Sequence, residues 1–226
     1  MKTDKLKYID YPFFQDDLAY KVNTDTIILG MFLDKMINKS VLDIGCNSGA
    51  LLLYAHHNGA NKLIGVDIHE DALKIAKKNL EMYAKDYELH CCPIENFESE
   101  EVDVIICNPP FFEMNNVTDD AYIKEAMFEE SLPLDDLFKA FRKFMKANGT
   151  VYMIYQADRF PELYEMCKRY KLKIMKMSFV HDVKSLHALR VLLKLKIGPM
   201  SKLKIYEPFL IDGGKIVKPA AYEERL

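Results

Sequence analysis

The sequence lacks any apolar run that approaches the ~18 residues of a membrane-spanning helix. Its first residues, MKTDKLKYIDYPFF, also lack the apolar core of a secretory signal. We therefore expect a soluble, cytoplasmic protein with no membrane partner. The chain has 226 residues and is half hydrophobic by count, which is enough for one domain with a large core.

Cysteine is scarce and is not arranged for metal binding. The five cysteines form no CxxC pair, and the adjacent Cys91 and Cys92 do not have the spacing of zinc ligands. Most of them end or adjoin apolar runs, as small buried side chains do in a reducing compartment. We therefore expect buried thiols and no metal site.

Repeats, low-complexity tracts and interdomain linkers are also absent, so we expect a single domain over residues 1–226. Short β-branched runs alternate with stretches of helical periodicity. The predicted strands are 40–45, 62–68, 87–92, 102–107, 150–156, 173–181 and 188–197. The predicted helices are 49–58, 70–84, 134–149 (closed by Asn148-Gly149) and 160–170.

This alternation predicts a three-layer α/β sandwich around a seven-stranded, mostly parallel sheet. No helix separates the last two strands, so they should form an antiparallel hairpin. We expect a core over 40–198, preceded by an N-terminal segment, 1–39. Residues 1–30 and the tail 199–226 should wrap this core.

Charge is unevenly distributed along the chain. Residues 1–138 hold 12 Lys/Arg and 26 Asp/Glu, whereas residues 139–204 hold 16 Lys/Arg and 4 Asp/Glu. A basic block of this size suits a polyanionic partner. A set of ordinary solvated lysine faces is the alternative reading, and charge alone does not exclude it.

The ends of the first two predicted strands suit a nucleoside ligand. Ligands of open α/β sheets bind beyond the carboxyl ends of the strands. The first strand ends in LDIGCNSGAL, where Gly45 and Gly49 allow a tight turn; this is neither GxGxxG nor a phosphate loop. The second ends at Asp67, whose carboxylate can accept hydrogen bonds from a ribose diol, and Ile68 would lie against adenine. A helix cap is the alternative role for Asp67.

Together VLDIGCNSGAL, GVDI and NPPF resemble the Rossmann-like methyltransferases that use S-adenosylmethionine. The resemblance implies that fold and that cofactor. It also implies that Asp43 and the Gly45–Gly49 loop, which includes Cys46 and Asn47, contact the methionine part of the cofactor. Asp67 would contact the ribose. The remaining cofactor candidates are Thr24, Asp25, Ile68, Ile94 and Asn108. Pro93 stands where many members have an acid, which leaves the Ile94 backbone or Glu95 to contact the adenine.

The tip NPPF resembles the [DNS]-P-P-[YFW] signature of amino methyltransferases, and its residues suit that chemistry. The Asn108 side-chain carbonyl and the Pro109 backbone carbonyl can each accept one N–H of a conjugated amine, which directs its lone pair at the methyl group. Pro110 stiffens the loop and removes a donor. Phe111 offers a face for stacking, worth about 1–3 kcal/mol per base. A proline-terminated strand with a hydrophobic plug is the alternative.

Two flanking segments narrow the substrate. YKVNTDTIILGMFL (20–33) resembles the KVGTDxxLLGxW segment of bacterial enzymes that methylate N6 of adenine 37, beside the anticodon of a valine tRNA, and SLHALRVLLKLKIG (185–198) and YEPFLI (206–211) resemble their closing segments. The implied partner is a tRNA anticodon loop, whose bases are already exposed. Candidate RNA contacts are Lys184, Arg190, Lys194 and Lys196. The 113–130 segment is either a lid or an ordinary surface excursion.

Three other functions share parts of this pattern. A protein glutamine-N5 methyltransferase would carry NPPF but usually has an N-terminal helical domain. A DNA adenine-N6 methyltransferase typically has a separate target-recognition domain. A catalytically silent RNA-binding protein on the same fold would not need the paired acceptors of NPPF. We expect a monomer.

Overall fold

The computed structural model describes residues 2–15, 21–109, 132–198 and 202–218. Its helices are α1 (Thr24–Phe32), α2 (Ala50–His57), α3 (Glu70–Glu81), α5 (Leu134–Phe144) and α6 (Phe160–Arg169), with a 3-10 turn η1 (Ile94–Asn96). The central strands are β3 (Ser40–Ile44), β4 (Lys62–Asp67), β5 (Tyr87–Cys91), β6 (Val102–Cys107), β7 (Met145–Gln156), β8 (Lys173–Asp182) and β9 (Ala188–Lys196). The outer strands are β1 (Lys2–Leu6), β2 (Tyr11–Gln15), β10 (Lys204–Ile205), β11 (Phe209–Asp212) and β12 (Lys215–Lys218).

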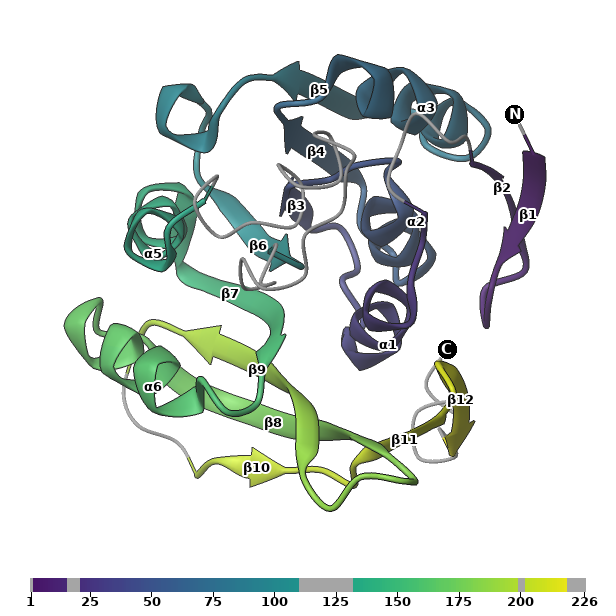
Figure 1. Ribbon diagram of the computed structural model, residues 1–226. Coiled ribbons are helices and arrows are strands. Elements are labelled where there is room, and N and C mark those ends of the chain that lie inside the picture. The colour runs from purple at the N-terminus through teal and green to yellow at the C-terminus, as the bar shows by residue number, and fades with distance from the viewer. Residues whose placement is uncertain (1, 16–20, 110–131, 199–201, 219–226) are drawn as a thin grey trace.

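The main sheet separates two layers of helices, as the sequence predicted (Figure 1). Its strand order is β12-β11-β8-β9-β7-β6-β3-β4-β5, with β10 beside β8. Because successive side chains of a strand face opposite sides, the core divides in two. Apolar residues of α1, α2 and α3 pack on one face, and those of α5 and α6 pack on the other.

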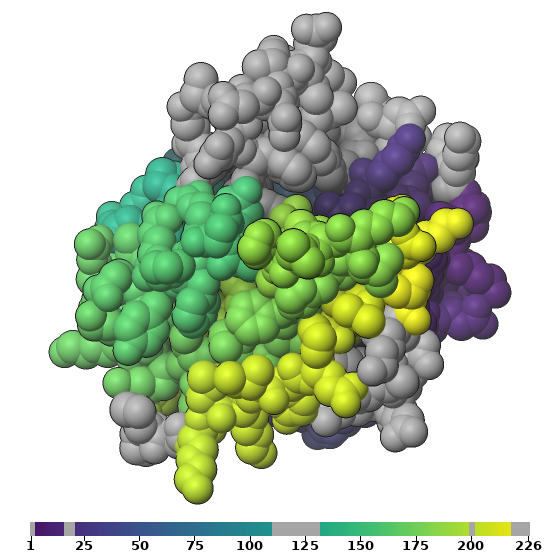
Figure 2. All heavy atoms as spheres, turned by 60° about the horizontal axis from the view of Figure 1, so that its bottom comes forward, coloured from purple at the N-terminus to yellow at the C-terminus, as the bar shows by residue number. Residues whose placement is uncertain are grey.

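All seven predicted strands form, and the last two are the expected antiparallel hairpin, in which β9 pairs with both β8 and β7. The described tail adds three strands, so the sheet has ten strands rather than seven. In Figure 2 the yellow tail runs along the green strands and reaches the purple N-terminal segment. The tail therefore completes the sheet instead of only covering it.

The predicted helix 134–149 is too long. Helix α5 ends at Phe144, and β7 begins at Met145. Asn148-Gly149 is not a helix cap but part of an irregular stretch, where the pairing with β6 shifts between Val102 and Val104. A Cβ on Gly149 would lie 2.9 Å from the Lys146 carbonyl oxygen, so the bend requires glycine.

The N-terminal segment packs on the helices and supplies α1 and a separate hairpin, β1–β2. The ring of Tyr11 stacks on that of Tyr83 at 4.2 Å, and the Tyr83 hydroxyl donates to the Pro12 carbonyl oxygen. Asn79 of α3, which is fully buried, accepts from Phe14 N and donates to the carbonyl oxygens of Phe14 and Ser48. One side chain therefore joins this hairpin to the loop after β3.

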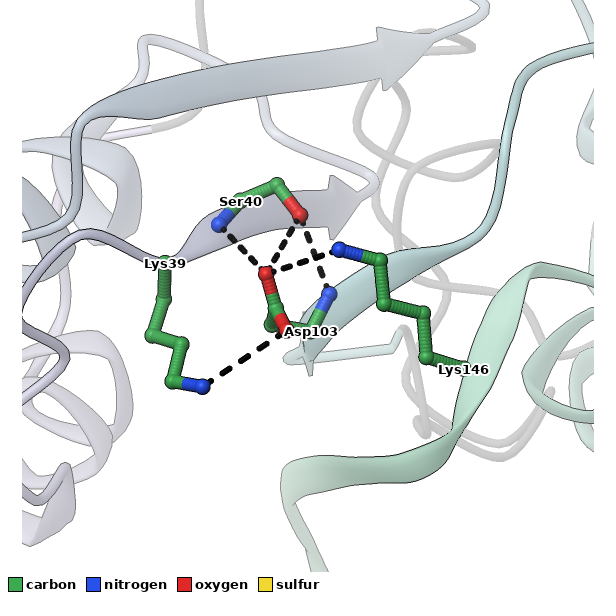
Figure 3. Close-up of polar contacts among 4 residues, drawn as sticks. All are labelled: Lys39, Ser40, Asp103 and Lys146. Carbon is green, nitrogen blue, oxygen red and sulfur yellow. Dashed lines mark hydrogen bonds and ion pairs between the residues drawn. The ribbon is translucent and has the colours of Figure 1, made fainter.

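A polar cluster closes the amino-terminal edge of the sheet (Figure 3). Oδ2 of Asp103 accepts from Ser40 N at 3.1 Å, Ser40 Oγ at 2.9 Å and Lys146 Nζ at 3.0 Å. Lys39 Nζ lies 3.6 Å from Oδ1. Although burial opposes ionisation, these bonds lower the pKa of Asp103 to about 2. The cluster joins the starts of β3, β6 and β7.

Within the described ranges, no helix is long and apolar enough to cross a membrane. The same residues contain no group of three His, Cys, Asp or Glu side chains that could hold a metal ion. Cys46, Cys107 and Cys167 are buried, whereas Cys91 is exposed and Cys92 is half-buried. The expectation of buried thiols therefore holds for the first three and is wrong for Cys91.

Candidate active site

Three neighbouring parallel strands bring the predicted site residues to one level. Ile44 of β3 pairs with Val66 of β4 and with Cys107 of β6. The residues that follow Ile44, Val66 and Cys107 in the sequence are Gly45, Asp67 and Asn108. The glycine, the acid and the amide therefore stand side by side at the carboxyl edge of the sheet, where ligands of this fold class bind.

The loop after β3 turns back on itself through three left-handed residues. Gly45, Asn47 and Gly49 have φ angles of 73°, 46° and 81°. A Cβ on Gly45 would meet no atom within 4 Å, so its surroundings are open, whereas a Cβ on Gly49 would lie 3.3 Å from that of Ala76. The loop therefore leaves space at Gly45 and packs tightly on α3 at Gly49.

Asp43 is a buried carboxylate at the end of β3. It is fully buried, and neither carboxylate oxygen has a hydrogen-bond partner among the described residues. Burial and the nearby charge of Asp67 raise the pKa of Asp43 well above its usual range. An unpartnered buried carboxylate is costly, so this site suits a ligand that supplies a donor or a positive charge.

Asp67 is the last residue of β4, and two backbone groups orient its side chain. Its Oδ2 accepts from Asn47 N at 2.7 Å, and its Oδ1 accepts from His69 N at 3.0 Å. Burial raises the pKa of Asp67, and these bonds oppose the shift. Each carboxylate oxygen can still accept another hydrogen bond. Ile68 is 39% exposed beside it, which leaves an apolar face for a ring.

The other cofactor candidates contribute differently. The side chain of Ile94 is buried in the core on the α5 side, which leaves its backbone for a ligand. Cys46 is buried, and a Cβ on Gly65 would lie 2.7 Å from its sulfur. Burial, together with the charges of Asp67 and Asp43, raises the pKa of the Cys46 thiol well above its usual range. Buried thiols of this kind are chemically unreactive.

Asn108 points its amide nitrogen at α1. Its Nδ2 donates to Oγ1 of Thr26 at 3.2 Å, a contact between residues 82 positions apart. Asn108 is half-buried and Pro109 is buried. Pro110, Phe111 and the 113–130 segment lie outside the described residues.

The start of α1 borders this edge of the sheet. The Thr24 hydroxyl donates to the Gly214 carbonyl oxygen of the tail. Asp25 accepts from Arg190 Nε of β9 at 3.0 Å. Both predicted cofactor residues therefore bind other parts of the chain, and Arg190, a predicted RNA contact, joins β9 to α1.

The four RNA candidates lie at different ends of the hairpin. Lys184 is in the turn after β8, at the carboxyl edge, and pairs with Asp212 at 2.9 Å. In the antiparallel pairing of β9 with β7, Arg190 lies opposite Gln156, the last residue of β7. Lys196 lies opposite Thr150, near the other edge of the sheet. Lys194 Nζ donates to Asp34 Oδ2 at 2.7 Å. Only Lys184 and Arg190 share the edge of Asn108.

Two residues of the site were missed by the sequence analysis. Thr26 contacts Asn108, and the N-cap pattern NTDT before an apolar run could have indicated a helix there. Asn79 holds the loop after β3 through Ser48. A polar residue on the apolar face of a predicted helix was the available signal for Asn79.

Comparisons with known proteins agree with this geometry. Residues 36–210 match the family described as a methyltransferase domain. A tRNA1(Val) (adenine(37)-N6)-methyltransferase of Flavobacterium johnsoniae is 28% identical over 85% of both chains. The protein of that name from Flavobacterium psychrophilum is 31% identical over 71% of this chain and 73% of its own.

A solved structure has the same fold at low identity. The ribosomal protein L11 methylase of Lactobacillus delbrueckii subsp. bulgaricus aligns with a TM-score of 0.58 and 18% identity, over 79% of this chain and 81% of its own. The predicted fold class is thereby confirmed. By its sequence and its methyltransferase domain, the chain belongs to the family of the tRNA1(Val) (adenine(37)-N6)-methyltransferases.

Proposed function

We propose that this protein transfers a methyl group from S-adenosylmethionine to N6 of an adenine in the anticodon loop of a tRNA, with adenine 37 of a valine tRNA as the expected target. The observation that carries the proposal is the alignment of Gly45, Asp67 and Asn108 at one edge of the sheet. The names of the relatives supply the substrate. A tRNA substrate fits a protein that acts in the cytoplasm.

The residues present fit the cofactor. Asp43 offers two buried oxygens that have no partner in the described chain, and the cofactor has an ammonium group that can donate to such oxygens. The open space at Gly45 lets a ligand approach the backbone. Asp67 has free acceptor capacity for a ribose diol, and Ile68 provides an exposed apolar face. When bound, the cofactor supplies an electrophilic methyl group.

Asn108 and Pro109 suit the amine. The Asn108 nitrogen donates to Thr26, which leaves the side-chain oxygen as an acceptor for one N–H of the adenine amine. The Pro109 carbonyl can accept the second. Two fixed acceptors direct the amine's lone pair at the methyl group, so catalysis rests on positioning. The amine becomes acidic only after it has been methylated, and no strong base is needed before that.

For the RNA, we assign Lys184 and Arg190 to the loop that carries the target adenine, since both lie at the edge of Asn108. Lys194 and Lys196 lie farther from that edge, and their contacts with RNA stay predictions. Phosphate contacts of this kind set affinity rather than sequence preference.

The test is a transfer assay with labelled S-adenosylmethionine. Unmodified tRNA transcripts, duplex DNA and a release factor are incubated separately with the protein, and the labelled nucleoside is identified after digestion. We expect N6-methyladenosine in the anticodon loop of tRNA only. Asn108→Ala should remove most of this activity, while Asn61→Ala, an exposed asparagine at the opposite edge, should not. Label in DNA or protein, or none at all, would overturn the proposal.

A further inference from the structure

Asn23, Thr26 and Asn108 form a chain of hydrogen bonds that ends at the candidate site. Asn23 caps α1, and its Oδ1 accepts from the Thr26 backbone N–H at 2.9 Å. The same oxygen lies 3.0 Å from Thr26 Oγ1. Thr26 Oγ1 in turn lies 3.2 Å from Asn108 Nδ2.

The positions of the protons along this chain follow from its first member. A backbone N–H can only donate, so Asn23 must present its oxygen to Thr26. The only proton available between that oxygen and the Thr26 hydroxyl belongs to the hydroxyl, which therefore donates to Asn23. A hydroxyl has one proton. Toward Asn108, the Thr26 oxygen can consequently only accept.

This order of donors and acceptors determines which way the Asn108 amide faces. The group opposite Thr26 must be the NH₂, because the alternative would bring two acceptor oxygens together. We propose that Thr26 is a positioning residue whose hydroxyl holds the Asn108 carboxamide with its oxygen toward the substrate amine. The inference rests on the proposed function, in which that oxygen accepts an N–H of adenine.

Helix α1 is fixed at both ends, which makes Thr26 a stable reference point. At its start, Asp25 pairs with Arg190 and the Thr24 hydroxyl bonds the tail at Gly214. After its end, Asp34 accepts from Lys176 at 3.0 Å and from Lys194 at 2.7 Å. Lys176, which is 4% exposed, also donates to the Phe32 carbonyl oxygen.

The decisive variants are Thr26→Val and Thr26→Ser. Valine has nearly the shape of threonine, and it retains the backbone N–H that Asn23 caps. It replaces the hydroxyl with a methyl group, so the Asn108 amide is free to turn its nitrogen toward the substrate. Serine keeps the hydroxyl. We expect Thr26→Val to lower the single-turnover methylation rate about 10-fold or more, with KM for tRNA and Kd for the cofactor within twofold. Thr26→Ser should stay within about threefold of the wild type.

A double-mutant cycle separates positioning from a general structural role. If Thr26 acts through Asn108, Thr26→Val should have almost no further effect on the single-turnover rate of Asn108→Ala. A structural role would instead slow both backgrounds by the same factor and overturn the inference. Equal losses for Thr26→Val and Thr26→Ser would also overturn it. Thermal unfolding of each variant shows whether it has folded.

The same data distinguish failure of this inference from failure of the proposed function. If Asn108→Ala methylates tRNA at the wild-type rate, the role of Asn108 in the proposed function is wrong. If Asn108→Ala is slow but Thr26→Val is fast, only the inference about Thr26 fails.

Discussion

The Asn47 backbone N–H donates a 2.7 Å hydrogen bond to Oδ2 of Asp67, which joins the loop after β3 to the end of β4. Asn47 itself has a left-handed φ of 46°. Two parts of the candidate cofactor site are thereby held in one arrangement. A substitution at Asp67 should consequently affect both the ligand contacts and the loop.

Asp67→Ala should weaken S-adenosylmethionine binding by roughly 10- to 100-fold, the loss of one or two charge-assisted hydrogen bonds. It should also lower the free energy of unfolding by about 1–3 kcal/mol, because the N–H groups of Asn47 and His69 lose their acceptor. Isothermal titration calorimetry and denaturant unfolding measure the two effects. Asp71→Ala, on the exposed start of α3, is the control and should change neither. Unchanged affinity would remove Asp67 from the site.

Asp43 should make the free protein less stable at neutral pH than its amide variant. Burial, and then the charge of Asp67, raise the folded-state pKa of Asp43 above that of the unfolded chain. Its contribution to stability is therefore fully present below the unfolded pKa of about 3.9 and is lost as pH rises through the folded pKa. The Asp43→Asn variant has no carboxyl group to ionise at this position, so its stability does not decline in this way as pH rises. At pH 7 the variant should unfold at a higher temperature than the wild type, and the difference should shrink toward pH 4.

The same substitution should impair cofactor binding. The ionised Asp43 is the form that attracts a cationic ligand, so wild-type affinity should fall as pH decreases and the carboxylate is protonated. In Asp43→Asn the affinity should be lower and this pH dependence weaker. Calorimetric titrations of both proteins at several pH values provide the comparison. An Asp43→Asn protein that is both less stable and fully able to bind would contradict the assignment.

Asn79 should be needed for both folding and cofactor binding. Its removal leaves Phe14 N, Phe14 O and Ser48 O without their bonds, so Asn79→Ala should lower the free energy of unfolding by about 2–4 kcal/mol. Asn79→Asp keeps the acceptor but places a carboxylate against two carbonyl oxygens, so it should destabilise at least as much. Both variants should also weaken cofactor binding through Ser48. Asn61→Ala should have little effect in the same unfolding experiment.

Much of the fold could be predicted because the central strands are short apolar runs with clear ends, and their carboxyl ends carry the polar residues of the site. The tail strands could not. Lys204 and Ile205 of β10 are exposed, and their pairing depends on the neighbouring β8 rather than on a local pattern. The early end of α5 could not be predicted from the sequence either, because Asn148-Gly149 has the composition of a helix cap but forms an irregularity in a strand.

Contacts between distant parts of the chain limited the prediction of the site. Lys194 and Lys196 were named as RNA contacts, but the sequence could not show that Asp34 pairs with Lys194. The bond between Thr26 and Asn108 spans 82 positions and forms only when the fold brings the start of α1 to the residue that follows β6. Motifs thus identified the residues that meet the ligands, whereas the residues that hold them in place needed the structure.

Asp103 should stabilise the fold without influencing catalysis, because its cluster (Figure 3) joins the starts of β3, β6 and β7, whereas Asn108 follows the end of β6. Asp103→Asn should lower the free energy of unfolding by about 1–3 kcal/mol and leave cofactor affinity unchanged. The folded-state pKa of about 2 is below that of the unfolded chain, so the stabilisation is present above about pH 4 and declines toward pH 2. Lys39→Ala, which removes the longer 3.6 Å contact, is the control, and its effect should stay below about 0.5 kcal/mol. A loss of cofactor affinity in Asp103→Asn would contradict the separation of the two edges.

Lys184 should contribute to tRNA binding more than Lys196 does, because it lies at the edge of Asn108 while Lys196 lies toward the other edge. Each phosphate contact to loop RNA contributes about 0.7 to the slope of log affinity against log salt. Lys184→Ala should therefore reduce that slope by about 0.7 without changing cofactor binding, since its exposed pair with Asp212 stabilises the fold little. Filter binding at four salt concentrations measures the slope, with Lys85→Ala, an exposed lysine after α3, as the control. If Lys196→Ala lowers the slope and Lys184→Ala does not, the RNA lies toward the opposite edge, and the assignment of Lys184 is wrong.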